Sequence, residues 1–373
     1  MRQPLLTAAP LLLAVLAAAP ALPAQTSRVD AYVQQQMAAQ MIPSVQVAVR
    51  QHGKLLASAA YGTASLELGV RAQPSHVYAL ASATKPFTAV AVGLLVDEGK
   101  LAFDDTLGAL LPAMPAAWRG VTVAQLLGHT SGLPDLVRDP MTLDLVAPTR
   151  DSALAVLATM PMQAAPGAAW SYNQTNYVLL GMIVERLGGV PFPEFVSARV
   201  LRPLSLASLS FGDSRDVVAS RVPWYSAIAR GADGRLRRAP EPRVSFVEYP
   251  SFMRTAAGLN GTAADVARFV EAVAEGKLVK PATRDRLWTA VPLADGKPFR
   301  MDGQLGVGLG WLVDDTPGRR WVGGTGGSSV AYHHYRESGL TVVVLTNLQG
   351  VDPDALVDGV AALYLPQATA GRK

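Results

Sequence analysis

Alternating apolar and polar positions begin near residue 44. Val45, Val47 and Val49 are each separated by one residue, which is the two-residue period of a β-strand. A turn signal follows at residues 51–54, where Gly53 can take the positive φ that a tight turn requires. A second apolar segment comes next, so the pattern predicts a β-hairpin.

Apolar residues at helical spacing predict helices on both sides of this hairpin. Residues 27–42 precede it, and residues 82–101 read as a mostly buried helix that ends at Gly99. Thr122, with Gln125 three residues later, has the pattern of a capping box and opens another helix.

The middle of the chain, from about residue 106 to 250, contains helical segments and proline-rich loops. One amphipathic helix is expected over residues 176–189, with Gly188 at its end. Near the end of the chain the pattern reverts to strands, over residues 329–338 and 340–347.

A turn around Ser338 and Gly339 joins these two strands, and residues 352–365 close the chain as a helix. Strands at both chain ends with helices between them predict an α/β (α+β) fold. An antiparallel sheet from both chain ends would be flanked by helices and carry a mostly helical inserted subdomain. The expected boundaries are about 25–105 and 251–373 for the sheet part and about 106–250 for the helical insertion.

The first residues have the pattern of a secretory signal peptide. Arg2 precedes an apolar run over residues 5–22, and small residues follow. Cleavage is expected after Ala24, with Ala21 as the alternative. Residues 1–24 are therefore predicted to be a signal peptide.

A membrane anchor is the competing interpretation of this leader. Pro10 and Pro20 interrupt the apolar run, and no basic stop-transfer flank follows it, which favours cleavage. Residues 25–373 would then be one exported domain, in the bacterial periplasm or secreted, with no membrane span in the mature form.

Composition narrows the functional classes. Of the 373 residues, 50% are hydrophobic and 17% charged, which predicts a sizeable core. The net charge is only +4 and no basic cluster is interleaved with aromatics, so no nucleic-acid partner is expected. The chain has no cysteine, which excludes thiol catalysis and thiolate–metal sites.

Other motifs that would indicate a metal or cofactor are missing. No H-E-x-x-H, P-loop or G-x-S-x-G sequence occurs. The adjacent His333 and His334 would point to opposite faces of a strand, which is poor geometry for shared metal binding. We therefore expect no metal and no cofactor.

Ser82 and Lys85 form the first catalytic candidate. Their i, i+3 spacing places both side chains on one helix face, and no other serine has a lysine three residues later. A lysine becomes a base at neutral pH when burial or a nearby cation lowers its pKa from about 10.4. A surface serine and lysine on a helix are the alternative interpretation.

Two further segments are candidates. Tyr172 lies on a loop just before the predicted helix and can supply a phenol to a site, although a loop anchor is the commoner role for a lone tyrosine. The stretch Trp321–Val330 contains four glycines in five positions. Glycines in a strand let a substrate approach the backbone closely and can aim an N–H group at an oxyanion.

Together these segments resemble the serine β-lactamase and penicillin-binding family, specifically its class C-like branch of AmpC-type β-lactamases, DD-carboxypeptidases and esterases. The resemblance covers nearly the whole mature chain. Besides the glycine-rich stretch, the matching segments are ASATKPFTA (81–89), LLGHTSGLPD (126–135), YNQTNYVLLG (172–181), RPLSL (202–206), AAGLNGTAADVARF (256–269) and VVVLTN (342–347).

The resemblance implies that Ser82 is the acylated nucleophile. Lys85 would handle its proton together with Tyr172, first for acylation and then for the deacylating water. The N–H groups of Ser82 and Gly327 would form the oxyanion hole. His129 lies in a segment that is structural in the family, so a packing and hydrogen-bonding role is expected.

The chain departs from the family at its tyrosine motif. The usual sequence is Tyr-x-Asn, whereas here Tyr172 is followed two residues later by Gln174. A longer amide can still bind a substrate carbonyl. A competing register, Ser171-Tyr172-Asn173, matches the Ser-x-Asn motif of other penicillin-recognising enzymes; the spacing to Tyr177 favours the tyrosine register.

The larger departure lies at the third motif, which usually reads Lys or His, then Thr or Ser, then Gly. The aligned residues are Gly324, Thr325 and Gly326, so the cation is missing from this predicted substrate-binding segment. A carboxylate substrate would lose a charge-assisted hydrogen bond of about 1.5–3 kcal/mol. Three arginines are candidate replacements: Arg254, Arg319 and Arg320.

The leading functional hypothesis is an exported serine hydrolase, of esterase or amidase type, acting on a small ester, amide or peptide-like substrate. A DD-carboxypeptidase or β-lactamase is one alternative. A non-catalytic penicillin-recognising or cell-wall-ligand-binding protein is the other. The sequence contains no feature that indicates an oligomeric state.

Overall fold

The computed structural model describes residues 22–139 and 143–366, and within residues 22–26 it describes the backbone only. Most of the predicted signal peptide, residues 1–21, lies outside the described residues. The first helix, α1, begins at Leu22.

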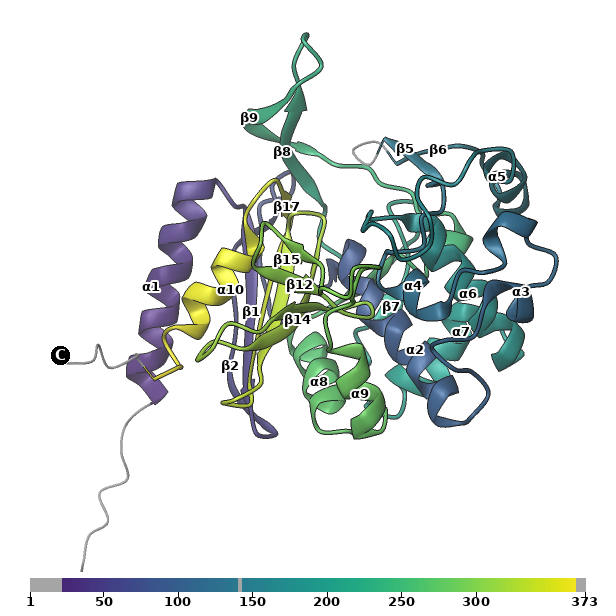
Figure 1. Ribbon diagram of the computed structural model, residues 1–373. Helices are drawn as coiled ribbons and strands as arrows, with labels where there is room; N and C mark the ends of the chain where they lie inside the picture. The colour runs from purple at the N-terminus through teal and green to yellow at the C-terminus, as the bar shows by residue number, and fades with distance from the viewer. Residues whose placement is uncertain (1–21, 140–142, 367–373) are drawn as a thin grey trace, which may run out of the picture.

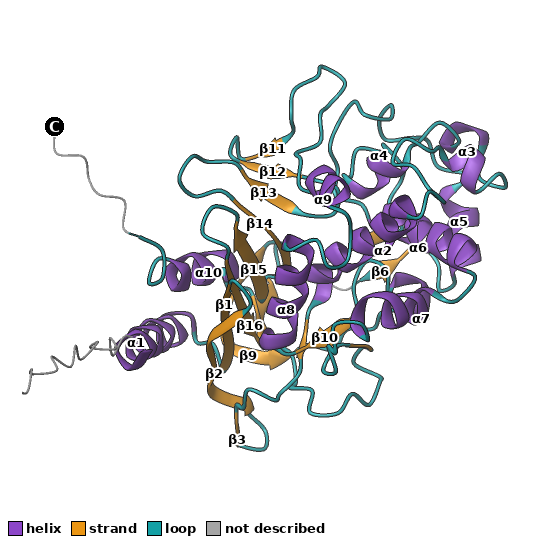
Figure 2. Ribbon diagram, turned by 90° about the horizontal axis from the view of Figure 1, so that it is seen from below, coloured by secondary structure: helices purple, strands orange, loops and turns teal. Residues whose placement is uncertain are grey.

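The main sheet is assembled from the two ends of the chain, and all its strand pairs are antiparallel (Figures 1 and 2). In the described chain its nine strands follow the order β11-β12-β13-β14-β15-β16-β1-β2-β3. Their bounds are β1 (Ser44–Gln51), β2 (Lys54–Ser65), β3 (Val70–Arg71), β11 (Arg300–Met301), β12 (Leu305–Val307), β13 (Leu312–Asp314), β14 (Trp321–Gly326), β15 (Val330–Tyr335) and β16 (Leu340–Thr346).

Smaller sheets and the helices complete the described chain. The remaining strands are β4 (Tyr78–Ala79), β5 (Val137–Asp139), β6 (Asp144–Leu145), β7 (Ser210–Phe211), β8 (Tyr225–Arg230), β9 (Leu236–Val244), β10 (Leu259–Gly261) and β17 (Leu348–Gln349). The longer helices are α1 (Leu22–Gln40), α2 (Lys85–Asp97), α5 (Arg150–Leu157), α6 (Gln174–Gly188), α8 (Ala263–Ala274), α9 (Pro281–Leu287) and α10 (Pro353–Ala361). The shorter ones are η1 (Ala81–Thr84), α3 (Leu107–Leu110), η2 (Ala116–Trp118), α4 (Val123–Leu127), α7 (Phe192–Val196), η3 (Ser197–Leu201) and η4 (Ser251–Met253).

The sheet is covered on both faces, which explains the uninterrupted apolar run over residues 342–345 of β16. Val342 and Val344 belong to the core beneath α1 and α10, whereas Val343 and Leu345 belong to the core on the α8 side. Figure 2 shows α1 and α10 on one side of the sheet and α8 on the other. A strand buried on both faces needs a continuous apolar run. The predicted fold class is confirmed.

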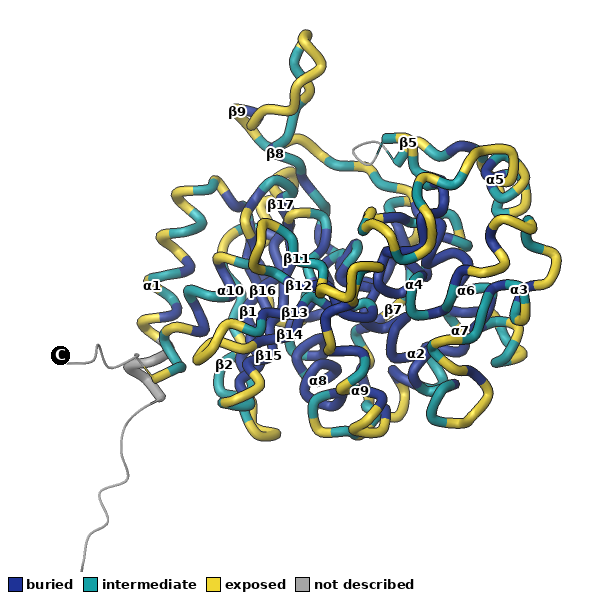
Figure 3. The backbone as a smooth tube through the Cα atoms, viewed as in Figure 1, coloured by how far each residue is buried: buried dark blue, intermediate teal, exposed yellow. Residues whose placement is uncertain are grey.

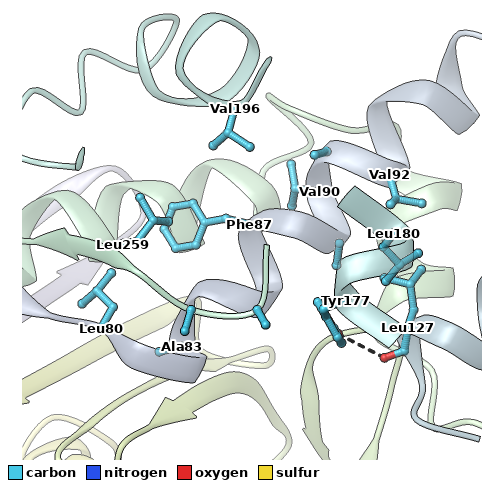
Figure 4. Close-up of a cluster of buried hydrophobic side chains, with 14 of the residues drawn as sticks. Leu80, Ala83, Phe87, Val90, Val92, Leu127, Tyr177, Leu180, Val196 and Leu259 are labelled. Carbon is cyan, nitrogen blue, oxygen red and sulfur yellow. Dashed lines mark hydrogen bonds between the residues drawn. The ribbon is translucent and has the colours of Figure 1, made fainter. Parts of the chain in front are cut away.

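Helix α2 runs through the interface between the sheet and the helical part of the molecule, and most of its side chains are buried. Phe87 stacks on Phe269 of α8 with ring centroids 3.6 Å apart. Phe87 also belongs to a buried cluster with Leu80 and Leu259 (Figure 4). Burial of one such side chain contributes about 1.5–3 kcal/mol, so the core that fixes α2 also fixes the residues at its start.

Most local expectations agree with the structure. Gly53 has φ +80° in the β1–β2 turn, and Gly99 has φ +69° after α2. The Thr122–Gln125 capping box forms at the start of α4. Helix α6 includes Gly188 and ends with Gly189 in the left-handed conformation.

The expectation of only helices and loops over residues 106–250 is wrong: besides the short strands β5, β6 and β7, this range contains the longer pair β8 and β9. Strands β8 and β9 form a hairpin that projects from the body of the molecule and is largely exposed (Figures 1 and 3). The Asp233-Gly234 turn was a usable signal, and Gly234 has φ +76°. Pro240 and Pro242 within β9 obscure the strand pattern. Edge strands tolerate proline because an N–H group on their outer side needs no partner in the sheet.

Candidate active site

Ser82 is held in a short, strained turn at the start of α2. The preceding residue, Ala81, has φ +46°, a conformation that alanine rarely adopts and that surrounding packing must enforce. The Ala83 N–H group donates to the Leu80 carbonyl, which fixes the turn. Ser82 is the second residue of η1, and helices leave the N–H groups of their first residues without intrahelical partners.

Lys85 lies beneath Ser82 and is only 5% exposed. Its Nζ is 3.3 Å from Ser82 Oγ and donates to the Ala256 carbonyl at 2.9 Å. The same nitrogen lies 4.7 Å from the ring centre of Tyr172 and 5.1 Å from that of Tyr177. The expected pairing of Ser82 with a buried lysine is present.

The Ala256 carbonyl is a contact that the sequence did not predict. Two neighbouring hydrogen bonds tie its loop to the nucleophile helix: Thr88 Oγ1 donates to the Thr255 carbonyl at 2.6 Å, and Thr84 Oγ1 accepts from Leu259 N at 3.2 Å. Every residue has a carbonyl, so residue type carried no signal for this role.

Tyr172 lies at the mouth of the site and is 42% exposed. Its ring contacts His129, with ring centres 4.6 Å apart, and the backbone of Ser171 donates to the His129 carbonyl. Among the hydrogen bonds of the described residues, none joins the Tyr172 hydroxyl to Ser82 or Lys85. Catalytic hydrogen bonds are often long without substrate, so Tyr172 stays a predicted catalytic residue.

His129 and Asn173 form a buried support beneath this tyrosine. His129 Nδ1 accepts from the Asn173 N–H at 3.2 Å. Burial, followed by the charge of Lys85, holds the pKa of His129 well below its usual value, while the Asn173 contact opposes the shift. His129 is therefore neutral, as the expected packing and hydrogen-bonding role requires.

The side chain of Asn173 bears on the competing Ser-x-Asn register. Its Oδ1 caps α6 by accepting from Asn176 N, and its Nδ2 donates to the Leu133 carbonyl. Both ends of the amide are used structurally. Gln174 instead contributes to a cavity that also contains Ser82, and its buried Oε1 has no partner among the described residues. The geometry favours the tyrosine register.

Residues Gly323–Gly327, which we call the glycine wall, face Ser82 across the site. A Cβ atom at position 326 would lie 2.6 Å from Ala83 N and 2.9 Å from Ser82 N, so only glycine allows β14 to approach η1 this closely. Thr325 Oγ1 donates to the Val330 carbonyl. Gly327 has φ +59° and lies beside Ser82.

The space for a side chain at position 324 is already filled. A Cβ atom there would lie 2.7 Å from Tyr332 Oη and 3.1 Å from Pro86 Cγ. Tyr332 is buried and donates to the Ala83 carbonyl at 2.9 Å, which ties β15 to the nucleophile turn. Tyr332 thus occupies the space that a lysine or histidine side chain at position 324 would need.

None of the three candidate arginines replaces that cation. Arg254 pairs with Asp216 at 2.9 Å, Arg319 pairs with Asp358 at 2.7 Å, and Arg320 approaches Glu337 at 3.8 Å. None of them contributes to the large cavity, where Lys85 is the only lysine or arginine among the described lining residues.

Two cavities meet at Ser82. The larger, about 500 Å³, lies between the glycine wall and an aromatic side that includes Trp170 and Trp311. The smaller, about 140 Å³, is lined mainly by apolar and aromatic side chains that include Trp224, Tyr249 and Met253. In the described part of the chain, no three His, Asp or Glu side chains are grouped so as to hold a metal ion.

His333 and His334 point to opposite faces of β15, as expected. His333 Nε2 lies 2.9 Å from Asp354 Oδ1 of α10, and its ring stacks on Trp321. His334 Nδ1 bonds instead to Thr341 Oγ1 at 2.9 Å. Neither histidine contributes to the two cavities at Ser82.

Comparison with known proteins gives the family. The family model described as Beta-lactamase matches residues 29–365. The chain belongs to the β-lactamase family. Membership of this family confirms the serine hydrolase class that the sequence motifs predicted. Among residues 22–139 and 143–366, no helix has both the length and the apolar character that crossing a membrane requires.

Curated relatives of this β-lactamase family chain include an esterase and a penicillin-binding protein. Esterase EstB of Burkholderia gladioli is 31% identical, covering 86% of the chain and 90% of that protein. Penicillin-binding protein 4* of Bacillus subtilis is 24% identical, covering 79% of the chain but only 66% of that protein.

Solved structures support the fold. The D-amino acid amidase of Ochrobactrum anthropi superposes with a TM-score of 0.77 at 21% identity, covering 91% of the chain and 99% of that protein. EstCE1, described as a hydrolase with promiscuous acyltransferase activity, gives a TM-score of 0.74 at 23% identity, covering 91% of the chain and 98% of that protein.

Proposed function

We propose that the protein hydrolyses small esters or amides through an acyl group carried on Ser82. The observation that carries this proposal is the buried Lys85 side chain, whose Nζ lies 3.3 Å from Ser82 Oγ at the point where two largely apolar cavities meet. A nucleophile paired with a proton acceptor, beside space for a substrate, is the arrangement that acyl transfer requires.

The reaction has two balanced halves. Ser82 Oγ attacks the substrate carbonyl carbon while its proton passes to the Lys85–Tyr172 pair, and the N–H groups of Ser82 and Gly327 bind the oxyanion. The bond to the leaving group then breaks, and the alcohol or amine takes the proton. Water then attacks the acyl carbon and gives a proton to the same pair. The bond from that carbon to Ser82 Oγ breaks, Oγ takes the proton back, and the acid is released.

The lining of the large cavity favours substrates without a carboxylate. Lys85 is its only lysine or arginine among the described residues, and it already bonds Ser82 and the Ala256 carbonyl. A carboxylate would therefore lack a charge-assisted partner worth about 1.5–3 kcal/mol. We accordingly rank ester or amide hydrolysis above β-lactamase and DD-carboxypeptidase action.

The relatives support the same ranking without deciding the substrate. EstB, named as an esterase, is the more similar of the two relatives described and matches along most of its length. The D-amino acid amidase shares the fold, so an amide substrate is the second candidate. We place the enzyme outside the cytoplasm, with residues 1–24 removed and residues 25–373 as one hydrolase unit.

A substrate panel on wild type and Ser82→Ala tests the proposal. Short nitrophenyl esters, D-amino acid amides, D-Ala-D-Ala peptides and a carboxylate-bearing β-lactam would be compared by kcat/KM. We expect ester turnover to exceed β-lactam turnover and to disappear in Ser82→Ala. Full ester turnover by Ser82→Ala would refute the acyl-serine route. Stable penicillin labelling without turnover of any substrate would favour a binding protein.

A further inference from the structure

The two cavities at Ser82 differ in their access to Lys85, one member of the proton-handling pair. Ser82, Tyr172 and Gly327 line both cavities, whereas Lys85 lines only the large one. In acyl transfer the leaving group must receive a proton, and the water that replaces it must lose one. Both therefore belong on the Lys85 side. If Ser82 is acylated as proposed above, the acyl group therefore lies in the small cavity.

Trp224 forms part of the wall of this small cavity. It lies just before β8, and its ring covers Gly327: a Cβ atom at position 327 would lie 2.5 Å from Trp224 Cζ2. On its other side, Trp224 lines a separate cavity of about 280 Å³ together with Val222 and Phe246. Val247 and Tyr249 also border both spaces. The indole therefore stands between the acyl cavity and a second, larger space.

The backbone holds this tryptophan in place from two directions. Its carbonyl accepts from Ser245 N of the returning chain at 2.7 Å. The next residue, Tyr225, donates to the Asn347 carbonyl at 2.8 Å and begins β8. Trp224 Nε1 has no hydrogen-bond partner among the described residues. Packing rather than a polar contact of the indole thus positions the ring, and a smaller side chain would leave the backbone supports intact.

We propose that Trp224 sets the maximum length of the acyl group that Ser82 accepts. Short acyl groups fit the cavity of about 140 Å³, and longer chains meet the indole. Removal of the indole opens the acyl cavity onto the space beyond it. The preference of the enzyme then moves toward longer acyl chains, while the catalytic residues stay in place.

The test compares nitrophenyl acetate, butyrate, octanoate and decanoate on wild type, Trp224→Phe and Trp224→Ala. Mis-sized apolar groups change kcat/KM by about 10- to 200-fold, so Trp224→Ala should raise the octanoate-to-butyrate ratio of kcat/KM at least about tenfold. Trp224→Phe should raise it less. Acetate hydrolysis supplies the reference rate of each variant.

Two variants serve as matched controls. Phe246 lines the outer cavity but not the acyl cavity, so Phe246→Ala should keep the wild-type ratio. Trp170 lines only the large cavity. Trp170→Ala should therefore alter discrimination between alcohol leaving groups while leaving the octanoate-to-butyrate ratio at its wild-type value.

Failure of this inference is distinguishable from failure of the proposed function. An unchanged ratio in Trp224→Ala, with hydrolysis still abolished by Ser82→Ala, would overturn the role of Trp224 and leave the hydrolase intact. Hydrolysis independent of Ser82 would overturn both. Should the alanine variant fail to fold, Trp224→Leu supplies the same comparison, and mass spectrometry of Ser82 labelled by short and long alkyl fluorophosphonates reports acyl-cavity length without turnover.

Discussion

On one side of the active site the chain contributes side chains, and on the other it contributes backbone and space. Ser82 and Lys85 present a hydroxyl and a buried side-chain nitrogen near the start of α2. In the glycine wall opposite, Thr325 is the only residue whose side chain is larger than a hydrogen atom. Each side depends on the other, because β14 reaches η1 only where Cβ atoms are absent.

This comparison shows that the reactive groups depend on the identity of single residues, whereas the shape of the active site depends on packing between residues. The chemical side depends on the identity of two residues, so substitution there should abolish turnover with little change in the fold. The glycine wall depends on what surrounds it, namely Tyr332 behind Gly324 and Trp224 over Gly327. Substitution there should disturb stability and activity together.

Loss of the Lys85 side-chain nitrogen should have the largest effect on turnover. Lys85→Met removes the proton-handling group, and we expect kcat to fall about 10³-fold. Exposed Lys100, which pairs with Glu98 at the surface, is the matched control, and Lys100→Met should keep wild-type rates. Steady-state ester kinetics measure both variants. A comparable fall of kcat in Lys85→Met and Lys100→Met would contradict the proposed role of Lys85 in proton transfer.

A single methyl group on the glycine wall should have the next largest effect. The Cβ of Gly326→Ala would press on Ala83 N and Ser82 N and displace the nucleophile turn. We expect overpacking to lower the free energy of unfolding by about 1–3 kcal/mol, and small displacements at a reacting centre reduce rates by about 10²-fold. Denaturant unfolding and ester kinetics measure the two effects.

Gly120 provides the control for this methyl group. It is exposed, and a Cβ atom there would meet no atom within 4 Å. Gly120→Ala should therefore leave both stability and rate unchanged. If Gly326→Ala behaved like Gly120→Ala, the close approach of β14 to η1 would not matter for catalysis.

Restoring the family cation should destabilise the protein without creating β-lactamase activity. The side chain of Gly324→Lys would collide with Tyr332, and we expect about 1–3 kcal/mol less stability. Turnover of a carboxylate-bearing β-lactam should not rise, because the collision also loosens the Tyr332–Ala83 contact that supports Ser82. Gly120→Lys is the control for added charge. A stable variant with increased β-lactam turnover would show that the room at position 324 is available.

The last prediction leaves turnover aside and concerns the strand behind the glycine wall, where two adjacent histidines should respond oppositely to pH. Burial opposes protonation of His333, but hydrogen bonds to Asp354 and Asp358 outweigh it and raise its pKa. Its protonation stabilises the fold fully below the unfolded pKa of about 6.5. The stabilisation is lost as pH rises through the folded pKa, so the gap between wild type and His333→Gln should shrink at higher pH.

Burial, aided by Arg284, lowers the pKa of His334 to about 4. The unfolded chain then binds the proton more strongly, so wild type should lose up to about 3 kcal/mol relative to His334→Gln as pH falls from 6.5 to 4. Denaturant unfolding between pH 4 and 8.5 measures both variants. The same pH trend in both would contradict the assignment of the two histidines to different faces.

The sequence predicted the chemical side better than the shape of the cavities. Ser82 and Lys85 were predictable because helix geometry fixes residues three apart on one face. The hairpins at the two chain ends were predictable from alternation and from turn glycines such as Gly53. The structure then placed these elements around one site.

The surroundings of the glycine wall were not predictable, because they depend on contacts between distant segments. Trp224 reaches Gly327 from more than a hundred residues away, and although Tyr332 and Gly324 are paired on the neighbouring strands β14 and β15, the Tyr332 hydroxyl is positioned by the Ala83 carbonyl of the nucleophile turn. The Ala256 carbonyl carries no residue signature at all. The β8–β9 hairpin escaped because a projecting edge strand need not alternate apolar and polar residues.

The same hairpin begins one residue after Trp224 and projects away from the body of the protein (Figure 1). Because most of β9 is exposed, its residues can be exchanged at little expense in stability. Selectivity for the acyl group would then be evolvable separately from the catalytic apparatus. Libraries that vary residues 223–246 and leave Ser82, Lys85 and Tyr172 untouched are a direct way to redirect such an enzyme toward new acyl donors.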